Sequence, residues 1–248
     1  MMNYLGIIPA RFASTRFPGK PLANIHGKTM IQCVYEQAKK AIDDVVVATD
    51  DDRIASKVRS FGGQVVMTAA DHQSGTDRCF EALHRYQELA SKHFEVIINI
   101  QGDEPFIQPE QINLVKTCFN DDSVDIATLV KKIDENSIIF DPNKVKVVVN
   151  KKMEAMYFSR SPVPHMRNTQ EAEWKKHHTF FLHIGMYAYR ASALEEISSL
   201  EQSSLELAES LEQLRWLENG LKIKTAETQY ESFGIDTPED LEQAINGM

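Results

Sequence analysis

Residues 7–22 read IIPARFASTRFPGKPL, a stretch that joins a buried strand to a cation-rich loop. The apolar run Tyr4–Ile8 is typical of a central strand, and Pro, Gly and Ser punctuate the loop that follows. Arg11, Arg16 and Lys20 lie on this loop, and no acidic residue precedes them. Small residues let backbone N–H groups approach phosphate oxygens, and each cation can reach a different oxygen. We therefore expect a polyphosphate site; the alternative is a solvated basic loop that caps the sheet.

Working outward, strand-like runs alternate with helical patterns through the first half of the chain. The loop lacks the Gly-Lys-Ser/Thr ending of a P-loop and is not the dinucleotide fingerprint. The alternation predicts an α/β fold with a Rossmann-like, mostly parallel central sheet covered by helices, which places the loop at the carboxyl ends of the strands, where ligands collect. The expected strands are 5–8, 45–48, 65–67, 96–100 and 126–130, and the expected helices are 30–41, 52–61, 76–89 and one after Pro109.

The middle of the chain has a different pattern. Residues 145–149, 155–159 and 179–189 are β-rich, which favours antiparallel strands. The polar, poorly periodic residues 166–176 between them predict a mobile loop. A smaller β-rich subdomain is therefore expected beside the parallel sheet.

The last part predicts two helices and one strand. Residues 205–218 have the spacing of a single helix, and 222–226 could form a last strand. Pro238 suits the first turn of the final helix, with Asp236 or Thr237 as its cap. Since no repeat or linker separates independent domains, we expect one domain over 1–248.

Composition limits the classes of function. With 27 basic and 36 acidic residues, the formal charge is -9, which argues against nucleic-acid binding. The three cysteines are scattered, so neither a disulfide framework nor a paired metal motif is expected. We find no signal-peptide pattern and no membrane-length apolar run. A cytoplasmic protein without membrane partners is the expectation.

A second polar motif, residues 70–78 (ADHQSGTDR), lies between an expected strand and an expected helix. Asp71, Ser74 or Thr76 could simply cap the helix. Ser74 and Arg78 are spaced to lie on one side of the helix start, where both can donate hydrogen bonds to the carbonyl edge of a base.

A third motif, residues 99–105 (NIQGDEP), ends what should be a central strand. Asp103 is our candidate ligand for Mg²⁺, which prefers a few hard oxygens plus substrate phosphates; Glu104 is less favoured, and a plain turn is the alternative. Asp236 could be a second metal carboxylate or only the cap of its helix. His183 and the Glu212-Gln213 pair would not be singled out on their own residues.

Taken together, these motifs closely resemble the 3-deoxy-manno-octulosonate cytidylyltransferase family, nearly from end to end. PAR…GKPL is shared by many sugar nucleotidyltransferases, whereas ADHQSGTDR combined with QGDEP and LEQLR is specific to this family. The motifs are IIPARFASTRFPGKPL, VATDDDRI, ADHQSGTDR, NIQGDEP, KVVV, YFSRSPVP, HIGMYAYR, LEQLRWLENG and GIDTPEDLE.

The resemblance implies that the chain couples CTP with 3-deoxy-manno-octulosonate (Kdo), an eight-carbon sugar acid, for lipopolysaccharide assembly. Arg11, Lys20 and Asp103 would be catalytic, since they would stabilise developing charge, and Asp103 and Asp236 would hold Mg²⁺. The implied CTP-binding residues are Arg11, Arg16, Lys20, Asp71, Ser74 and Arg78.

The resemblance also implies a sugar site and a homodimer. The implied Kdo-binding residues are Gln101, Arg160, His183, Tyr187, Glu212 and Gln213. Arg160 would take the carboxylate, because a planar guanidinium matches it bidentately. The implied parts are nucleotide binding over about 1–130, sugar binding and dimer contact over about 140–190, and site-completing helices over about 191–248.

Two other readings remain open. The acceptor could be another keto-sugar acid, such as sialic acid or 8-amino-Kdo, because the phosphate machinery would be the same. A catalytically inactive nucleotide-binding module is the alternative of a different class, although such modules usually lose a cation or a metal carboxylate.

Overall fold

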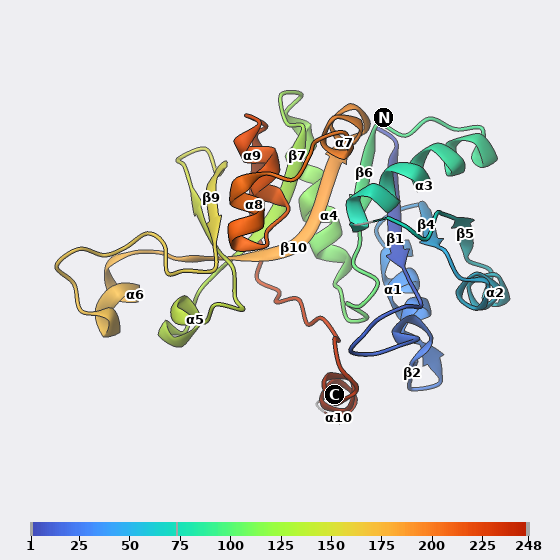
Figure 1. Cartoon of the computed structure of the whole chain (residues 1–248), viewed down its shortest axis with the longest axis horizontal. Coiled ribbons are helices and arrows are strands. Elements are labelled where there is room, and N and C mark those ends of the chain that lie inside the picture. Colours follow the sequence, from blue (N-terminus) through green and yellow to red (C-terminus); the bar gives the residue numbers. More distant parts are fainter. Residues whose placement is uncertain (1, 73, 247–248) are drawn as a thin grey trace. The chain divides into compact units, whose positions relative to one another are not determined.

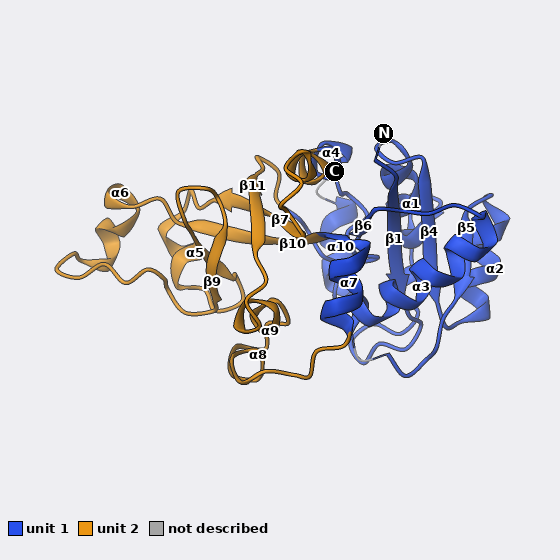
Figure 2. Ribbon diagram, turned by 90° about the horizontal axis from the view of Figure 1, so that it is seen from above, with its two compact units in different colours: residues 1–113, 188–198, 232–248 blue, residues 114–187, 199–231 orange. Residues whose placement is uncertain are grey.

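The computed structural model describes residues 2–72 and 74–246 (Figure 1). Contacts divide the chain into two compact units (Figure 2). Unit 1 comprises residues 1–113, 188–198 and 232–248, and unit 2 comprises residues 114–187 and 199–231. These boundaries differ from the three parts expected from sequence, and the single-domain organisation stays a prediction.

Unit 1 is built on four parallel strands in the order β6, β1, β4, β5. In β1, Ile7 pairs with Val46 on one side and with Asn99 on the other. Leu5, Ile7 and Ile8 are fully buried, as expected of a central strand covered on both faces. The bounds are β1 Tyr4–Ala10, β4 Asp44–Thr49, β5 Gln64–Met67 and β6 Val96–Asn99.

Helices pack on this sheet through apolar stripes. In α3, Cys79, Ala82, Leu83 and Tyr86 recur at helical spacing and are all buried. This helix contacts β1, whereas α1 contacts β4 and α2 contacts β5. The helices are α1 Met30–Lys39, α2 Asp52–Ser60, α3 Gly75–Ala90, α7 Ala191–Ser198 and α10 Pro238–Asn246, and α4 Pro109–Thr117 crosses into unit 2. The short hairpin of β2 Asn24–Ile25 and β3 Lys28–Thr29 and the helix α7 had not been predicted.

Unit 2 is β-rich, as the middle of the sequence predicts. Strand β7 lies between β10 and β11, and β11 is parallel to β7. The pairs β8–β9 and β8–β10 are antiparallel. The bounds are β7 Ile126–Lys132, β8 Lys146–Val149, β9 Ala155–Ser159, β10 Phe181–Arg190 and β11 Ile223–Glu227, and the last three residues of β10 belong to unit 1. The predicted α/β class with a mostly parallel sheet and a β-rich part is confirmed.

The single helix predicted over residues 205–218 is wrong. The segment forms two helices, α8 Ser204–Glu209 and α9 Gln213–Glu218, because Ser210 adopts a left-handed conformation with φ 53°. The buried Arg215 guanidinium donates to both Glu206 carboxylate oxygens, at 2.8 and 2.7 Å, and ties α9 to α8. The apolar spacing therefore belongs to two short helices that pack together.

The predicted loop at residues 166–176 contains short helical turns. Residues Glu171–Glu173 form a 3-10 turn and α6 spans Trp174–His177, while α5 Asn136–Phe140 lies earlier in the same unit. The Trp174 side chain is 3% exposed and stacks on Phe180 at 5.9 Å. A single apolar anchor in a polar window leaves no periodic signal, and the mobility of this segment stays a prediction.

Candidate active site

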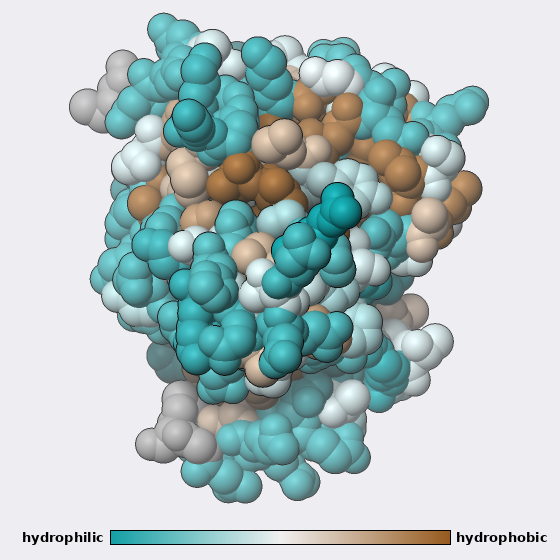
Figure 3. All heavy atoms as spheres, turned by 90° about the vertical axis from the view of Figure 1, so that its left-hand side faces the viewer, coloured by the Kyte–Doolittle hydropathy of each residue, from teal (hydrophilic) through white to brown (hydrophobic). Residues whose placement is uncertain are grey.

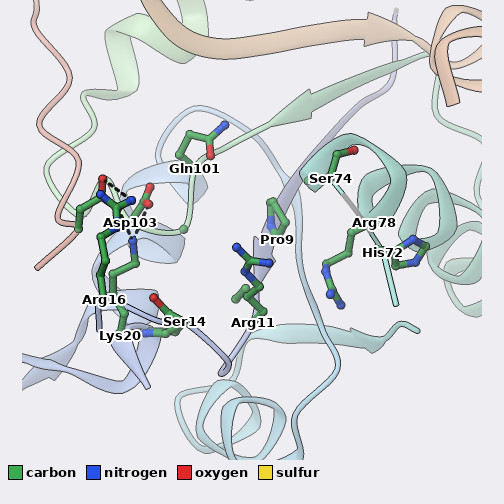
Figure 4. A pocket seen from close by; sticks show the side chains of 15 residues that line it. Pro9, Arg11, Ser14, Arg16, Lys20, His72, Ser74, Arg78, Gln101 and Asp103 are labelled. Atoms are coloured by element: carbon green, nitrogen blue, oxygen red, sulfur yellow. Dashed lines mark hydrogen bonds and ion pairs between the residues drawn. The ribbon is translucent and has the colours of Figure 1, made fainter. Parts of the chain in front are cut away.

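A cavity of about 340 Å³ opens in unit 1 at the carboxyl ends of β1 and β6 (Figure 4). Four cationic side chains and two carboxylates line it, a local positive surplus in a chain of formal charge -9. The structure thus brings together eight of the residues proposed from sequence: Arg11, Arg16, Lys20, Ser74, Arg78, Gln101, Asp103 and Asp236. Asp71 is exposed and is not part of the lining.

The cationic loop after β1 is closed on itself. The Gly19 N–H donates to the Phe12 carbonyl at 3.0 Å, and Gly19 has φ 73°, a conformation that favours glycine. A Cβ on Gly19 would also lie 3.0 Å from the Phe12 ring. Below the loop, the Arg53 guanidinium lies 3.3 Å from the centre of that ring. These contacts fix the path that carries Arg16 and Lys20 into the cavity.

Lys20 lies between the two carboxylates proposed for a metal. Its Nζ is 2.7 Å from Asp103 Oδ2 and 3.2 Å from Asp236 Oδ1, as the dashed lines in Figure 4 mark. Arg16 pairs with the other Asp236 oxygen at 3.1 Å. Lys20 thus contacts one carboxylate 83 positions away in sequence and another 216 positions away. A triphosphate could replace the carboxylates on the cations, and a dication could replace the ammonium on the carboxylates.

The backbone places Asp103 against the end of β1. A Cβ on Gly102 would lie 2.7 Å from the Pro9 carbonyl oxygen, so only glycine allows this approach. The next residue, Glu104, is 8% exposed, and burial raises its pKa to about 7. Asp103 is thus the carboxylate that faces the cavity, and Glu104 is turned into the core.

Asp236 is not the cap of α10. Thr237 Oγ1 accepts the Asp240 N–H at 3.2 Å, and the Asp240 carboxylate accepts the backbone N–H groups of Thr237 and Asp236. The Ile235 N–H donates to the Asp103 carbonyl at 2.9 Å, which ties the two acidic segments together. The Asp236 carboxylate is therefore available to the cavity.

The two carboxylates that meet at the Lys20 ammonium are suitable ligands for Mg²⁺. This ion takes one or two carboxylates and completes its coordination shell with water and phosphate oxygens. Among the described residues, no group of three or more His, Cys, Asp or Glu side chains could hold a metal. Asp103 and Asp236 could supply two of the oxygens that such an ion takes.

The start of α3 forms another wall of the cavity. Ser74 is its cap: Ser74 Oγ accepts the Asp77 N–H at 3.1 Å, and Asp77 accepts the Ser74 N–H at 3.2 Å. Of the three candidate caps, Asp71, Ser74 and Thr76, the structure assigns the role to Ser74, and Thr76 is buried. The capping bond uses only an acceptor position of the Ser74 hydroxyl, so its O–H remains a donor.

Arg78 is buried in the same wall. Its guanidinium donates to Thr68 Oγ1 at 2.6 Å and to Asp50 Oδ2 at 3.1 Å. These bonds engage two of its five N–H donors and hold the plane of the group. The remaining donors suit the acceptor edge of a base.

His72 also lines the cavity, although the sequence reasoning did not propose it. Its Nε2 lies 2.5 Å from Glu81 Oε2, which also accepts the Ala69 N–H at 2.8 Å. Arg85 pairs with the other Glu81 oxygen at 2.6 Å. The only signal in sequence was the position of His72 within the ADHQSGTDR motif.

The other five proposed sugar residues lie in unit 2. The rings of His183 and Tyr187, both on β10, are 5.3 Å apart. Burial lowers the pKa of His183 to about 4, so its imidazole is neutral at pH 7. Burial and then the Glu212 carboxylate raise the pKa of Tyr187 well above its usual value, which places Glu212 near this ring. Gln213 is 5% exposed, and its Nε2 has no acceptor among the described residues.

Arg160 is held at the end of β9 by backbone carbonyls. Its Nε donates to the Glu209 carbonyl at 2.8 Å, Nη1 to Pro142 at 3.2 Å and Nη2 to Ser210 at 3.4 Å. One N–H on each terminal nitrogen has no acceptor within residues 2–72 and 74–246. A carboxylate takes such a pair bidentately.

Comparison with known proteins identifies the class. A family model described as cytidylyltransferase matches residues 5–223. A solved structure of 4-diphosphocytidyl-2C-methyl-D-erythritolsynthase from Anaerococcus prevotii, at 13% identity and covering 99% of this chain and 96% of that one, has a TM-score of 0.62 and shares the fold. The family match, which spans most of the chain, shows that this chain is a cytidylyltransferase.

Closer relatives narrow the family. The 3-deoxy-manno-octulosonate cytidylyltransferase of Parabacteroides distasonis is 61% identical, covering 99% of this chain and 98% of that protein. The enzyme of that name from Bacteroides thetaiotaomicron is 57% identical, covering 98% and 97%. A solved CMP:2-keto-3-deoxy-manno-octonic acid synthetase complexed with CTP has a TM-score of 0.90 at 42% identity, covering 99% and 98%. This chain belongs to the 3-deoxy-manno-octulosonate cytidylyltransferase family.

Proposed function

We propose that this enzyme transfers CMP from CTP to the anomeric hydroxyl of Kdo, giving CMP-Kdo and pyrophosphate. The hydroxyl oxygen attacks the α-phosphorus, the bond from that phosphorus to the β-phosphate oxygen breaks, and the hydroxyl proton leaves to solvent. The observation that carries this proposal is the single cavity that joins the cationic loop, the carboxylate pair and the start of α3.

Arg11, Arg16 and Lys20 are proposed to bind the triphosphate. Negative charge develops on the leaving pyrophosphate, and cations already held in place stabilise it most. The pinned loop supports this role, because Lys20 and Arg16 need only exchange carboxylate oxygens for phosphate oxygens.

Asp103 and Asp236 are proposed to hold Mg²⁺. The bound ion would act as a Lewis acid on the phosphate oxygens and lower the pKa of the attacking hydroxyl. The two carboxylates already converge on the Lys20 ammonium, which supports their joint binding of one metal ion.

Base and sugar are proposed to bind through donors that the fold has already oriented. The Ser74 hydroxyl and those N–H groups of Arg78 that have no acceptor in the described part of the chain would bind the cytosine edge. In unit 2, Arg160 would bind the Kdo carboxylate, because one N–H on each of its terminal nitrogens has no acceptor among the described residues. A neutral sugar would bring no negative charge to this guanidinium. The implied role of Gln101, which lines the cavity of unit 1, and those of His183, Tyr187, Glu212 and Gln213 remain part of the same proposal.

The test is a pyrophosphate-release assay with CTP, Mg²⁺ and a panel of sugar acids. We expect turnover with Kdo and much weaker turnover with sialic acid. Turnover with 8-amino-Kdo or sialic acid but not with Kdo would reassign the substrate. No pyrophosphate release with any sugar acid, despite CTP binding, would favour the inactive-module alternative.

Asp103→Asn tests the metal role. We expect turnover to fall at least ~100-fold, because the amide oxygen is a weaker ligand for a hard cation. Asp125→Asn, at an exposed position of unit 2, is the control and should retain full activity. Wild-type turnover of Asp103→Asn across a Mg²⁺ titration would refute the assignment.

We also propose a homodimer in a reducing cytoplasm. The strand β9 pairs only with β8 among the described strands, and its Met156 is 62% exposed. Figure 3, which views the side where β9 and α6 lie in Figure 1, shows apolar side chains gathered among polar ones. The three cysteines are free thiols. No helix among the described residues is long and apolar enough to cross a membrane. Light scattering of Met156→Glu against wild type tests the dimer, and an unchanged mass would exclude this contact.

A further inference from the structure

Lys146 is a buried lysine outside the sites described above. It begins β8, its side chain is fully buried, and its Nζ donates three hydrogen bonds to backbone carbonyls. The acceptors are Asp141 at 2.8 Å, Lys144 at 2.7 Å and Arg160 at 2.6 Å. An ammonium has three N–H donors, so all are engaged, as a buried charge requires.

These bonds join the turn before β8 to Arg160. The turn, residues 141–144, meets Arg160 twice: through Lys146, which binds the Arg160 carbonyl, and through the Pro142 carbonyl, which accepts from the guanidinium. The backbone pairing of Lys146 with Ser159 already aligns β8 with β9. The ammonium is therefore not needed for strand pairing, and its specific effect is on the residue after β9.

Glu209 holds the same residue from the other side. Its Oε2 accepts the Arg160 N–H at 2.9 Å, and its Oε1 accepts the Ser159 hydroxyl at 2.6 Å. Lys146 and Glu209 thus fix the carbonyl and the amide of Arg160, while three other carbonyls orient its guanidinium. Because both the backbone and the guanidinium of Arg160 are held, the side chain loses little conformational freedom when a carboxylate binds.

We infer that Lys146 is a positioning residue for the sugar acid: it holds Arg160 in the orientation that receives the substrate carboxylate. This inference rests on the proposed function. A merely structural lysine would support the fold of unit 2 without acting through Arg160. The two roles differ in which Michaelis constant changes and in whether the effect depends on Arg160.

The test compares Lys146→Met with wild type in steady-state kinetics. We expect the KM for Kdo to rise about 10- to 100-fold, as misplaced binding groups commonly cause, with the KM for CTP nearly unchanged. Lys224→Met is the matched control. Its ammonium also donates to a backbone carbonyl in unit 2, that of Lys152, but lies on β11 away from Arg160, so both constants should stay at wild-type values.

A double-mutant cycle decides whether Lys146 acts through Arg160. In an Arg160→Ala background, Lys146→Met should add little to the KM for Kdo, because the positioned group is already gone. Should Lys146→Met fail to fold, Lys146→Gln, which keeps two N–H donors, enters the same cycle. Additive effects, or equal increases in both Michaelis constants, would overturn the positioning role. If wild type turns over no sugar acid, the proposed function fails instead.

Discussion

At the scale of single residues, Lys20 is the cation that connects the two carboxylates of the cavity. Its side chain is only 14% exposed, and its ammonium touches two carboxylates from distant segments. A partly buried ion pair is screened less than a surface one, so its electrostatic effect on a bound phosphate is large. Lys20 can therefore neutralise Asp103 and Asp236 in the free enzyme and a phosphate in the complex.

Replacing Lys20 by Met should lower kcat/KM for CTP about 10²- to 10³-fold, the usual effect of losing one charge-stabilising donor. Lys28→Met is the control, because Lys28 pairs with Glu36 at the surface at 2.5 Å and lies outside the cavity. Steady-state pyrophosphate release measures both variants. A loss smaller than tenfold for Lys20→Met would contradict its role.

At the scale of elements, two helices, α3 and α8, begin with the same capping motif. Ser74 and Asp77 form a capping box on α3, and Ser203 and Glu206 form one on α8. Only the first lines the cavity. Comparing Ser74 with Ser203 therefore distinguishes the effect of a cap on helix stability from the effect of a hydroxyl on ligand binding.

Ser74→Ala and Ser203→Ala should each destabilise the protein by about 1 kcal/mol through the lost cap. Only Ser74→Ala should also raise the KM for CTP, because its hydroxyl faces the cavity. Thermal denaturation and CTP titration of both variants measure the two effects. An equal change in CTP affinity for both would show that Ser74 acts through the helix alone.

At the scale of the whole molecule, stability should depend on pH through His183. Burial lowers its pKa in the folded state to about 4, whereas the unfolded value is 6.5. Between these values the unfolded chain binds a proton that the folded chain does not. Stabilisation is therefore complete above about pH 6.5 and is lost as the pH falls towards 4, by about 3 kcal/mol.

Denaturant titration at several pH values measures this loss. Both tryptophans, Trp174 and Trp216, lie in unit 2 with His183, so their fluorescence reports the relevant unit. His183→Gln should flatten the dependence between pH 6.5 and 4, and exposed His93→Gln should leave it unchanged. A wild-type slope in His183→Gln would assign the acid sensitivity to other groups.

Much of the fold followed from local patterns. The alternation of apolar runs predicted β1, β4, β5 and β6 within two residues at each end, because buried parallel strands have few polar interruptions. The break between α8 and α9 was missed, since the left-handed Ser210 has no signal in a sequence window that reads as one helix. Trp174 was missed because one apolar anchor creates no periodicity.

The candidate site was predicted one segment at a time. Each cationic or acidic motif follows a strand or opens a helix, and that position alone favours a ligand site. Asp236 could have capped its helix or faced a ligand. Thr237 and Asp240 form the capping hydrogen bonds with each other, so the Asp236 carboxylate is left to face the cavity. Such competition among neighbouring hydrogen bonds is settled only by geometry.

The sequence by itself determined the strand-and-helix alternation, the cationic loop and the family, because these depend on residue type and local order. The tertiary structure alone decided that Lys20 joins Asp103 to Asp236, that Ser74 is the cap of α3 and that Lys146 holds Arg160. These contacts connect residues through folding of the backbone, and the energy of a charge or hydrogen bond depends on distance and burial, which no local pattern specifies.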